Sequence, residues 1–129
     1  MSVGDWQPEP QPLATLEQAQ VTRLLGQLEE NAGDLNWVAD ELTWVSPLAK
    51  ASKAAWVAAT DTLEETALIA LIRFFTQLES QQGWNLGADS PVIPLFKALK
   101  KQQGAVDREL VQWVKQNTDN KFLPFGPLL

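Results

Sequence analysis

The stretch from Thr62 to Gly83 limits the possible folds most strongly, because its apolar residues recur at the spacing of an α-helix. Thr62 and Glu65 fit a capping box, which predicts where the helix begins, and Gly83 predicts its end. A helix that is apolar on most of its sides is typical of a central, buried position. The apolar residues of this stretch are Leu63, Ala67, Leu68, Ile69, Ala70, Leu71, Ile72, Phe74, Phe75 and Leu78.

Five further segments show helical spacing or carry residues that are typical of helix ends. They cover residues 13–31, 34–45, 46–60, 90–103 and 106–117. Ser46-Pro47 is expected to separate the second helix from the third, because Ser is a good cap and Pro suits the first helical position. No segment alternates with a period of two, so essentially no sheet is expected. The sequence therefore predicts an all-α fold, a compact irregular bundle of five or six helices.

The two ends of the chain differ from this helical part. Residues 1–12 are polar and carry three alternating prolines, so we expect an extended, flexible arm followed by a single helical domain at 13–129. Residues 117–129 form an irregular tail that is expected to pack on the bundle or on a partner. The first residues do not resemble a signal peptide, and no stretch approaches the roughly 18 apolar residues that cross a bilayer. We therefore expect a cytoplasmic protein that does not bind a membrane.

The composition excludes several classes of catalysis. The 129 residues include no His, Cys or Tyr, whereas Trp occurs six times. Without His and Cys the chain has no Ser-His-Asp triad, no thiolate nucleophile and no zinc site of the usual kind. The adjacent acids Glu29-Glu30, Asp40-Glu41 and Glu64-Glu65 point in different directions on a helix, which disfavours a carboxylate pair. We therefore favour a non-enzymatic protein and expect no cofactor and no metal site.

The many large apolar side chains favour contact with a partner as the function. The candidates for partner binding are Trp84, in the loop after Gly83, and four residues of the tail, Phe122, Leu123, Phe125 and Leu128. Such side chains are costly to leave exposed, so each is expected to pack on the body of the protein or on a partner. The sequence thus favours a protein–protein interaction module or adaptor, with either another protein or a second copy of the chain as the partner.

The charge distribution supports an alternative function. The net charge is −6, but residues 91–129 hold six basic and three acidic side chains. Lys97, Lys100 and Lys101 share one helical face, and Lys115 follows, which makes them candidates for binding nucleic acid or another anionic ligand. The acidic chain as a whole disfavours a nucleic acid partner. An enzyme that uses only Asp, Glu, Lys or Ser is a second alternative.

Two charged residues and two tryptophans occupy faces that are otherwise apolar. Glu41 and Arg73 are candidates for a buried ion pair, because a buried charge is costly unless it is paired. Trp37 and Trp44 lie seven residues apart on one helical face. We favour packing of this pair in the core between the second and fourth helices over an anchor for a partner.

Overall fold

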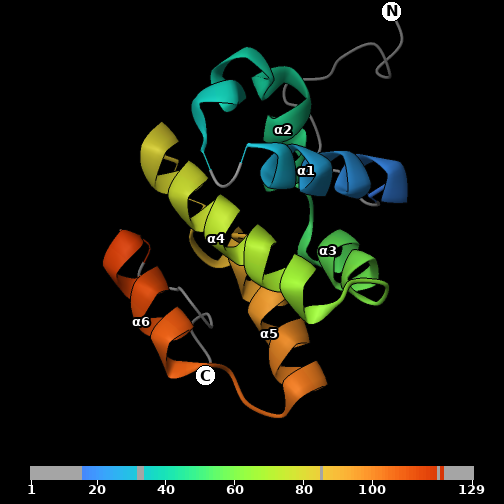
Figure 1. Ribbon diagram of the computed structural model, residues 1–129, viewed down its shortest axis with the longest axis vertical. Coiled ribbons are helices and arrows are strands. Elements are labelled where there is room, and N and C mark those ends of the chain that lie inside the picture. Colours follow the sequence, from blue (N-terminus) through green and yellow to red (C-terminus); the bar gives the residue numbers. More distant parts are fainter. Residues whose placement is uncertain (1–15, 32–33, 85, 119, 121–129) are drawn as a thin grey trace, which may run out of the picture.

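The computed structural model describes residues 16–31, 34–84, 86–118 and 120, and this part of the chain is all-α, as predicted (Figure 1). None of the helices in these ranges is both long and apolar enough to cross a membrane. The expected arm at residues 1–12 lies outside the described residues. The elements are α1 (Gln18–Glu30), η2 (Asn36–Asp40), α2 (Leu42–Ala49), α3 (Lys53–Thr60), α4 (Glu65–Gln82), η3 (Gly87–Asp89), α5 (Val92–Gln103) and α6 (Arg108–Asn117), where η denotes a 3-10 helix.

The long helix α4 is central, as its sequence predicts. It packs most extensively on α5, which lies behind it in Figure 1, and α1 and α6 contact it from opposite sides. The large apolar side chains of α4 point into this packing and are buried, among them Leu71 and Phe75. Gly83 ends the helix with a φ of 67°, a left-handed conformation that glycine adopts without steric cost.

The beginning of α4 differs from the expected capping box. Glu64 is the residue that precedes the helix, and no side chain caps it. The Thr62 hydroxyl instead donates to the Ala59 carbonyl, at 3.3 Å. Thr62 therefore belongs to the turn that ends α3, because its side chain satisfies a carbonyl of that helix.

The predicted boundary at Ser46-Pro47 is also wrong. Helix α2 continues through Pro47 to Ala49, and α3 begins only after Ser52, whose hydroxyl accepts from the Ala55 N–H at 3.1 Å. Pro47 removes one hydrogen bond from α2, but the burial of Leu48 and Ala49 opposes that loss. Tertiary packing thus overrides the local signal.

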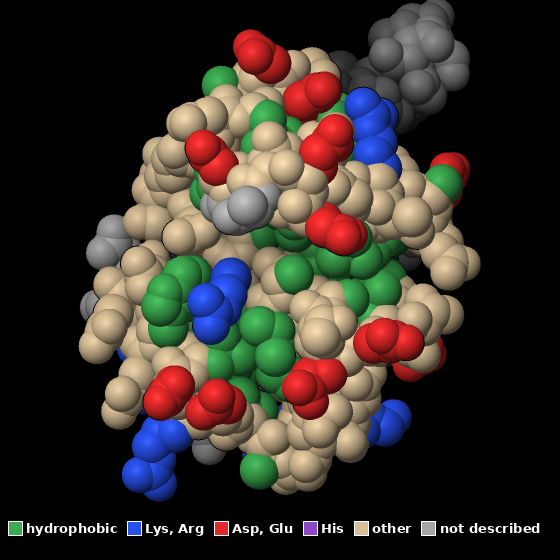
Figure 2. All heavy atoms as spheres, in the orientation of Figure 1, with side chains coloured by type: hydrophobic (Ala, Val, Ile, Leu, Met, Phe, Trp, Pro, Cys, Tyr) green, Lys and Arg blue, Asp and Glu red, His purple; other side chains and the backbone are tan. Residues whose placement is uncertain are grey.

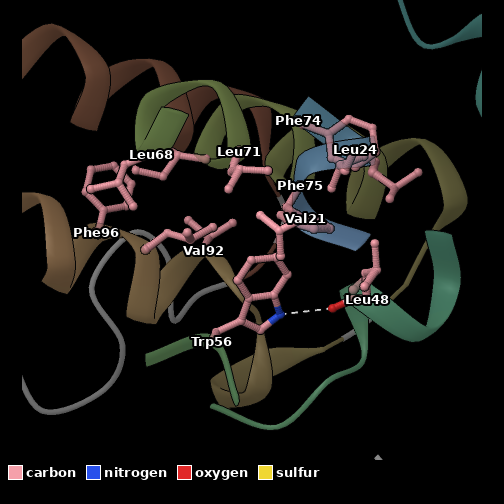
Figure 3. Close-up of a cluster of buried hydrophobic side chains, with 14 of the residues drawn as sticks. Val21, Leu24, Leu48, Trp56, Leu68, Leu71, Phe74, Phe75, Val92 and Phe96 are labelled. Atoms are coloured by element: carbon pink, nitrogen blue, oxygen red, sulfur yellow. Dashed lines mark hydrogen bonds between the residues drawn. The ribbon is translucent and has the colours of Figure 1, made fainter. Parts of the chain in front are cut away.

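Trp56 of α3 joins three helices in the core (Figure 3). Its side chain is completely buried, and its indole N–H donates to the Leu48 carbonyl of α2 at 2.9 Å. Its ring meets the Phe75 ring of α4 edge to face, with 5.3 Å between the centroids. A buried indole is favourable only where its N–H finds an acceptor, and the end of α2 supplies that acceptor.

We expect Trp56→Phe to lower the free energy of unfolding by about 2 kcal/mol, because it removes a buried hydrogen bond and leaves a void. Urea denaturation would measure this change. Val57→Ala is the matched control, since Val57 is 54% exposed and its truncation should change stability by less than about 0.5 kcal/mol. Equal stability of Trp56→Phe and the wild type would contradict the role of this residue.

Candidate functional site

A groove runs along one side of α4, and its central part lies between α1 and α6. Figure 2 shows hydrophobic side chains exposed there, with Asp and Glu side chains around them. The central pocket of the groove has a volume of about 740 Å³. Side chains of α4 form its floor, short toward the start of the helix and longer toward its end, and residues from α1, α6 and the connection to η2 form its walls. It is lined by Leu25, Leu28, Glu29, Leu35, Thr66, Ala67, Ala70, Arg73, Phe74, Gln77 and Trp113.

Two smaller pockets extend the central one in both directions. A pocket of about 390 Å³ shares Leu35 and Gln77 with it and reaches Gln81 near the end of α4. A pocket of about 340 Å³ shares Arg73 with it, lies where α4, α5 and α6 meet, and reaches Glu65 at the start of α4. From Glu65 to Gln81 a helix rises by about 24 Å. Both smaller pockets share lining residues with the central one, and we call the three together the α4 groove.

The groove exists because one side of α4 carries short side chains. Ala67 and Ala70 are only half-buried, and Thr66 is exposed, although the sequence predicts a helix that is buried almost all round. Residues three and four positions apart share a helical face, so these residues line up along the axis. Short side chains leave the space between α1 and α6 open.

Acidic residues outnumber basic ones along the α4 groove. Glu29 lines the central pocket, Asp34 lines the pocket toward Gln81, and Glu65 and Asp107 line the pocket toward the start of α4. Among the described lining residues, Arg73 is the only base. Its guanidinium carbon lies 5.3 Å from the centroid of the Trp113 ring, at cation–π distance. The acids therefore lie in the central pocket as well as at both ends of the groove.

The expected buried ion pair between Glu41 and Arg73 is replaced by other contacts. Arg73 is exposed, because it belongs to the open side of α4. The Glu41 carboxylate accepts from the Trp44 indole N–H at 2.8 Å and lies 3.9 Å from a guanidinium nitrogen of Arg23. The Glu41 side chain is 37% exposed, so the charge stays partly hydrated and needs no buried partner.

Trp37 and Trp44 take part in a stack that begins at the surface and ends in the core. The Arg23 guanidinium lies 4.2 Å from the centroid of the Trp44 ring, and Trp44 stacks on Trp37 with 6.0 Å between the centroids. Trp37 in turn stacks on Phe74 of α4 at 5.9 Å. The expected single helix over residues 34–45 is divided into η2, which holds Trp37, and α2, which holds Trp44. The favoured interpretation, packing of the pair against α4, agrees with these contacts.

The remaining predicted residues lie elsewhere. Trp84 is half-buried beyond the end of α4, and the Lys50 ammonium lies 4.8 Å from its ring centroid. The lysines of α5 are exposed, as is Lys115 of α6. Neither these lysines nor Trp84 line the α4 groove. The exposed lysines of α5 are Lys97, Lys100 and Lys101, and the tail candidates Phe122, Leu123, Phe125 and Leu128 lie outside the described residues.

Glu79 is a buried acid that sequence reasoning missed. It is 2% exposed, and its carboxylate accepts from the Ser90 hydroxyl at 2.6 Å, which ties the end of α4 to the segment before α5. Burial raises the pKa of Glu79 to about 7, and hydrogen bonding from the side chains of Ser90 and Asn120 opposes the rise. The sequence does carry a signal of this burial, because Glu79 lies four residues after Phe75 and therefore on the same buried face of the helix.

The structure defines an all-α protein with an open groove along its central helix. Comparisons with protein-family models, with curated proteins and with solved structures give no match. Within the ranges that the structure describes, no group of three or more acidic residues is arranged to hold a metal ion. The α4 groove is the candidate site that the geometry supports best, because it combines volume, length and an apolar lining.

We expect Glu79 to make stability depend on pH. Its folded-state pKa of about 7 exceeds the ordinary 4.5, so its contribution is fully present below about pH 4.5 and is lost as the pH rises through 7. The loss amounts to about 3 kcal/mol. The side chain introduced by Glu79→Gln does not titrate, so this loss should be absent from the variant. Between acidic and mildly basic pH, the difference in unfolding free energy between Glu79→Gln and the wild type should therefore shift by about 3 kcal/mol in favour of the variant.

Urea denaturation at several pH values would measure the difference. Glu30→Gln is the control, because Glu30 is exposed and its replacement should leave the pH profile of stability unchanged. Identical pH profiles for Glu79→Gln and the wild type would contradict the raised pKa.

Proposed function

We propose that this protein is a non-enzymatic, cytoplasmic interaction module that binds a protein partner in the α4 groove. The proposal rests on one observation: the α4 groove is open along a helix that is otherwise buried, and its central pocket has a volume of about 740 Å³. The apolar side chains Leu25, Leu35 and Trp113 are half-buried in the groove, and a partner that covers them completely gains hydrophobic free energy. The absence of His, Cys and Tyr from the sequence supports binding over catalysis.

The residues of the groove are of the types that dominate binding energy at protein interfaces. Trp113 is half-buried and supplies aromatic surface, and Arg73 lies over its ring. Trp and Arg are enriched among residues whose truncation costs most binding energy. Leu25 and Leu28 complete the apolar wall on the side of α1. These side chains favour a protein segment over a small polar ligand.

Filling the groove tests the proposal. Ala70→Trp places an indole on the floor and should reduce binding of the partner by about tenfold or more, since the partner loses its contact area. Ala54→Trp is the matched control, because Ala54 is exposed on α3 and does not line the groove. Affinity capture from lysate with each tagged full-length variant, followed by mass spectrometry, would identify proteins retained by the wild type and Ala54→Trp but lost with Ala70→Trp.

Equal capture by Ala70→Trp and Ala54→Trp would overturn the proposal. A full-length variant with Phe122→Ser and Phe125→Ser distinguishes the tail from the groove as the contact. If this variant alone loses the partner, the tail is the binding segment and the groove is not. Circular dichroism of each variant would verify that the helices are retained.

A further inference from the structure

We infer that the segment bound in the α4 groove is a basic amphipathic helix of about four turns. This inference rests on the proposed function and specifies the chemistry of the partner. Three properties of the groove lead to it: the length of the groove, the lack of a sheet edge and the distribution of its charges.

The length of the groove matches a helix of moderate size. The floor spans about 24 Å along α4, which corresponds to about 16 residues of a second helix. The half-buried alanines of the floor, Ala67 and Ala70, allow the backbone of that helix to approach closely. Helix axes in contact lie about 8 to 10 Å apart, and the shortest distances require small side chains.

A helix suits this groove better than an extended peptide. An extended peptide gains affinity from backbone hydrogen bonds to the edge of a sheet, and the described part of this chain contains no strand. The floor of the groove is a helix whose own backbone groups already bond to one another. A helical partner satisfies its backbone internally and needs only an apolar stripe to contact the half-buried side chains Leu25, Leu35 and Trp113.

The charges of the groove specify a basic partner. Its acids are spread along the full length, from Asp34 at one end through Glu29 to Glu65 and Asp107 at the other. The single base, Arg73, lies against Trp113. Lys and Arg side chains on the polar edges of a bound helix would face these acids. Such exposed pairs act mainly on association rate and selectivity, and salt screens them.

Synthetic peptides of about 16 residues test the inference, because that length fills the groove. Three peptides share one stripe of leucines at helical spacing and carry lysine, glutamine or glutamate at the polar positions. Fluorescence anisotropy with the full-length protein would measure their dissociation constants. We expect the basic peptide to bind about tenfold more tightly than the neutral one at low salt, the acidic peptide not to bind, and the difference to vanish near about 0.5 M salt.

Neighbouring glutamates provide matched controls for the charges. Glu29→Gln with Glu65→Gln removes two lining charges, and Glu30→Gln with Glu64→Gln removes two exposed charges one position away that do not line the groove. Both pairs change the net charge equally. The lining pair should abolish most of the preference for the basic peptide, whereas the neighbouring pair should retain it. Ala70→Trp should weaken binding of the basic peptide, and Ala54→Trp should not.

The possible failures are distinguishable from failure of the proposed function. Equal binding of the basic and neutral peptides, abolished by Ala70→Trp, would overturn the charge inference and retain the groove as a binding site. Absence of binding by all three peptides would overturn the helical occupant, while the capture experiment decides the proposed function separately. Dimers in light scattering that disappear with Ala70→Trp would make a second copy the occupant. Tighter binding of all peptides after Phe122→Ser and Phe125→Ser would make the tail the occupant.

Discussion

Helices α4 and α5 make the most extensive contact of the described chain, and α1, α3 and α6 each pack on one of these two helices. The large side chains of α4, among them Leu71 and Phe75, are buried, so its small residues remain on the side away from that packing. Helices α1 and α6 contact α4 at its flanks and leave Ala67 and Ala70 between them. Hydrophobic stabilisation scales with the buried apolar area, so burial of the side of α4 that carries the larger residues contributes most. The groove is the consequence of this asymmetry along a single helix.

The described tryptophans take different roles because their surroundings differ. Trp56 is completely buried and needs a hydrogen-bond acceptor from α2. Trp44, Trp84 and Trp113 are half-buried, and each has a cationic side chain over its ring. The ring faces attract the cation while the rest of the indole packs on the protein. The same residue type thus stabilises the core in one place and forms the wall of the groove in another.

Much of the fold could be predicted from the sequence, but the candidate site could not. The ends of α4 and α5 at Gly83 and Gly104 follow from local backbone preferences, and both glycines have positive φ. The expected helix boundary at Ser46-Pro47 failed because burial of Leu48 outweighed a local preference. The burial of Glu79 could have been predicted from its position on the apolar face of α4. Its hydrogen bond with Ser90 could not, because Ser90 is eleven residues away and belongs to another segment.

The sequence by itself determined the all-α class and the order of the helices, because helical spacing and end signals act between residues a few positions apart. It also determined which chemistries the chain lacks, since absent side chains cannot be supplied by folding. Only the tertiary structure decided that Leu25, Ala70 and Trp113 share one groove and that Glu41 and Arg73 lie apart. These relations join residues that are distant in the chain, and they follow from which face of α4 the neighbouring helices cover.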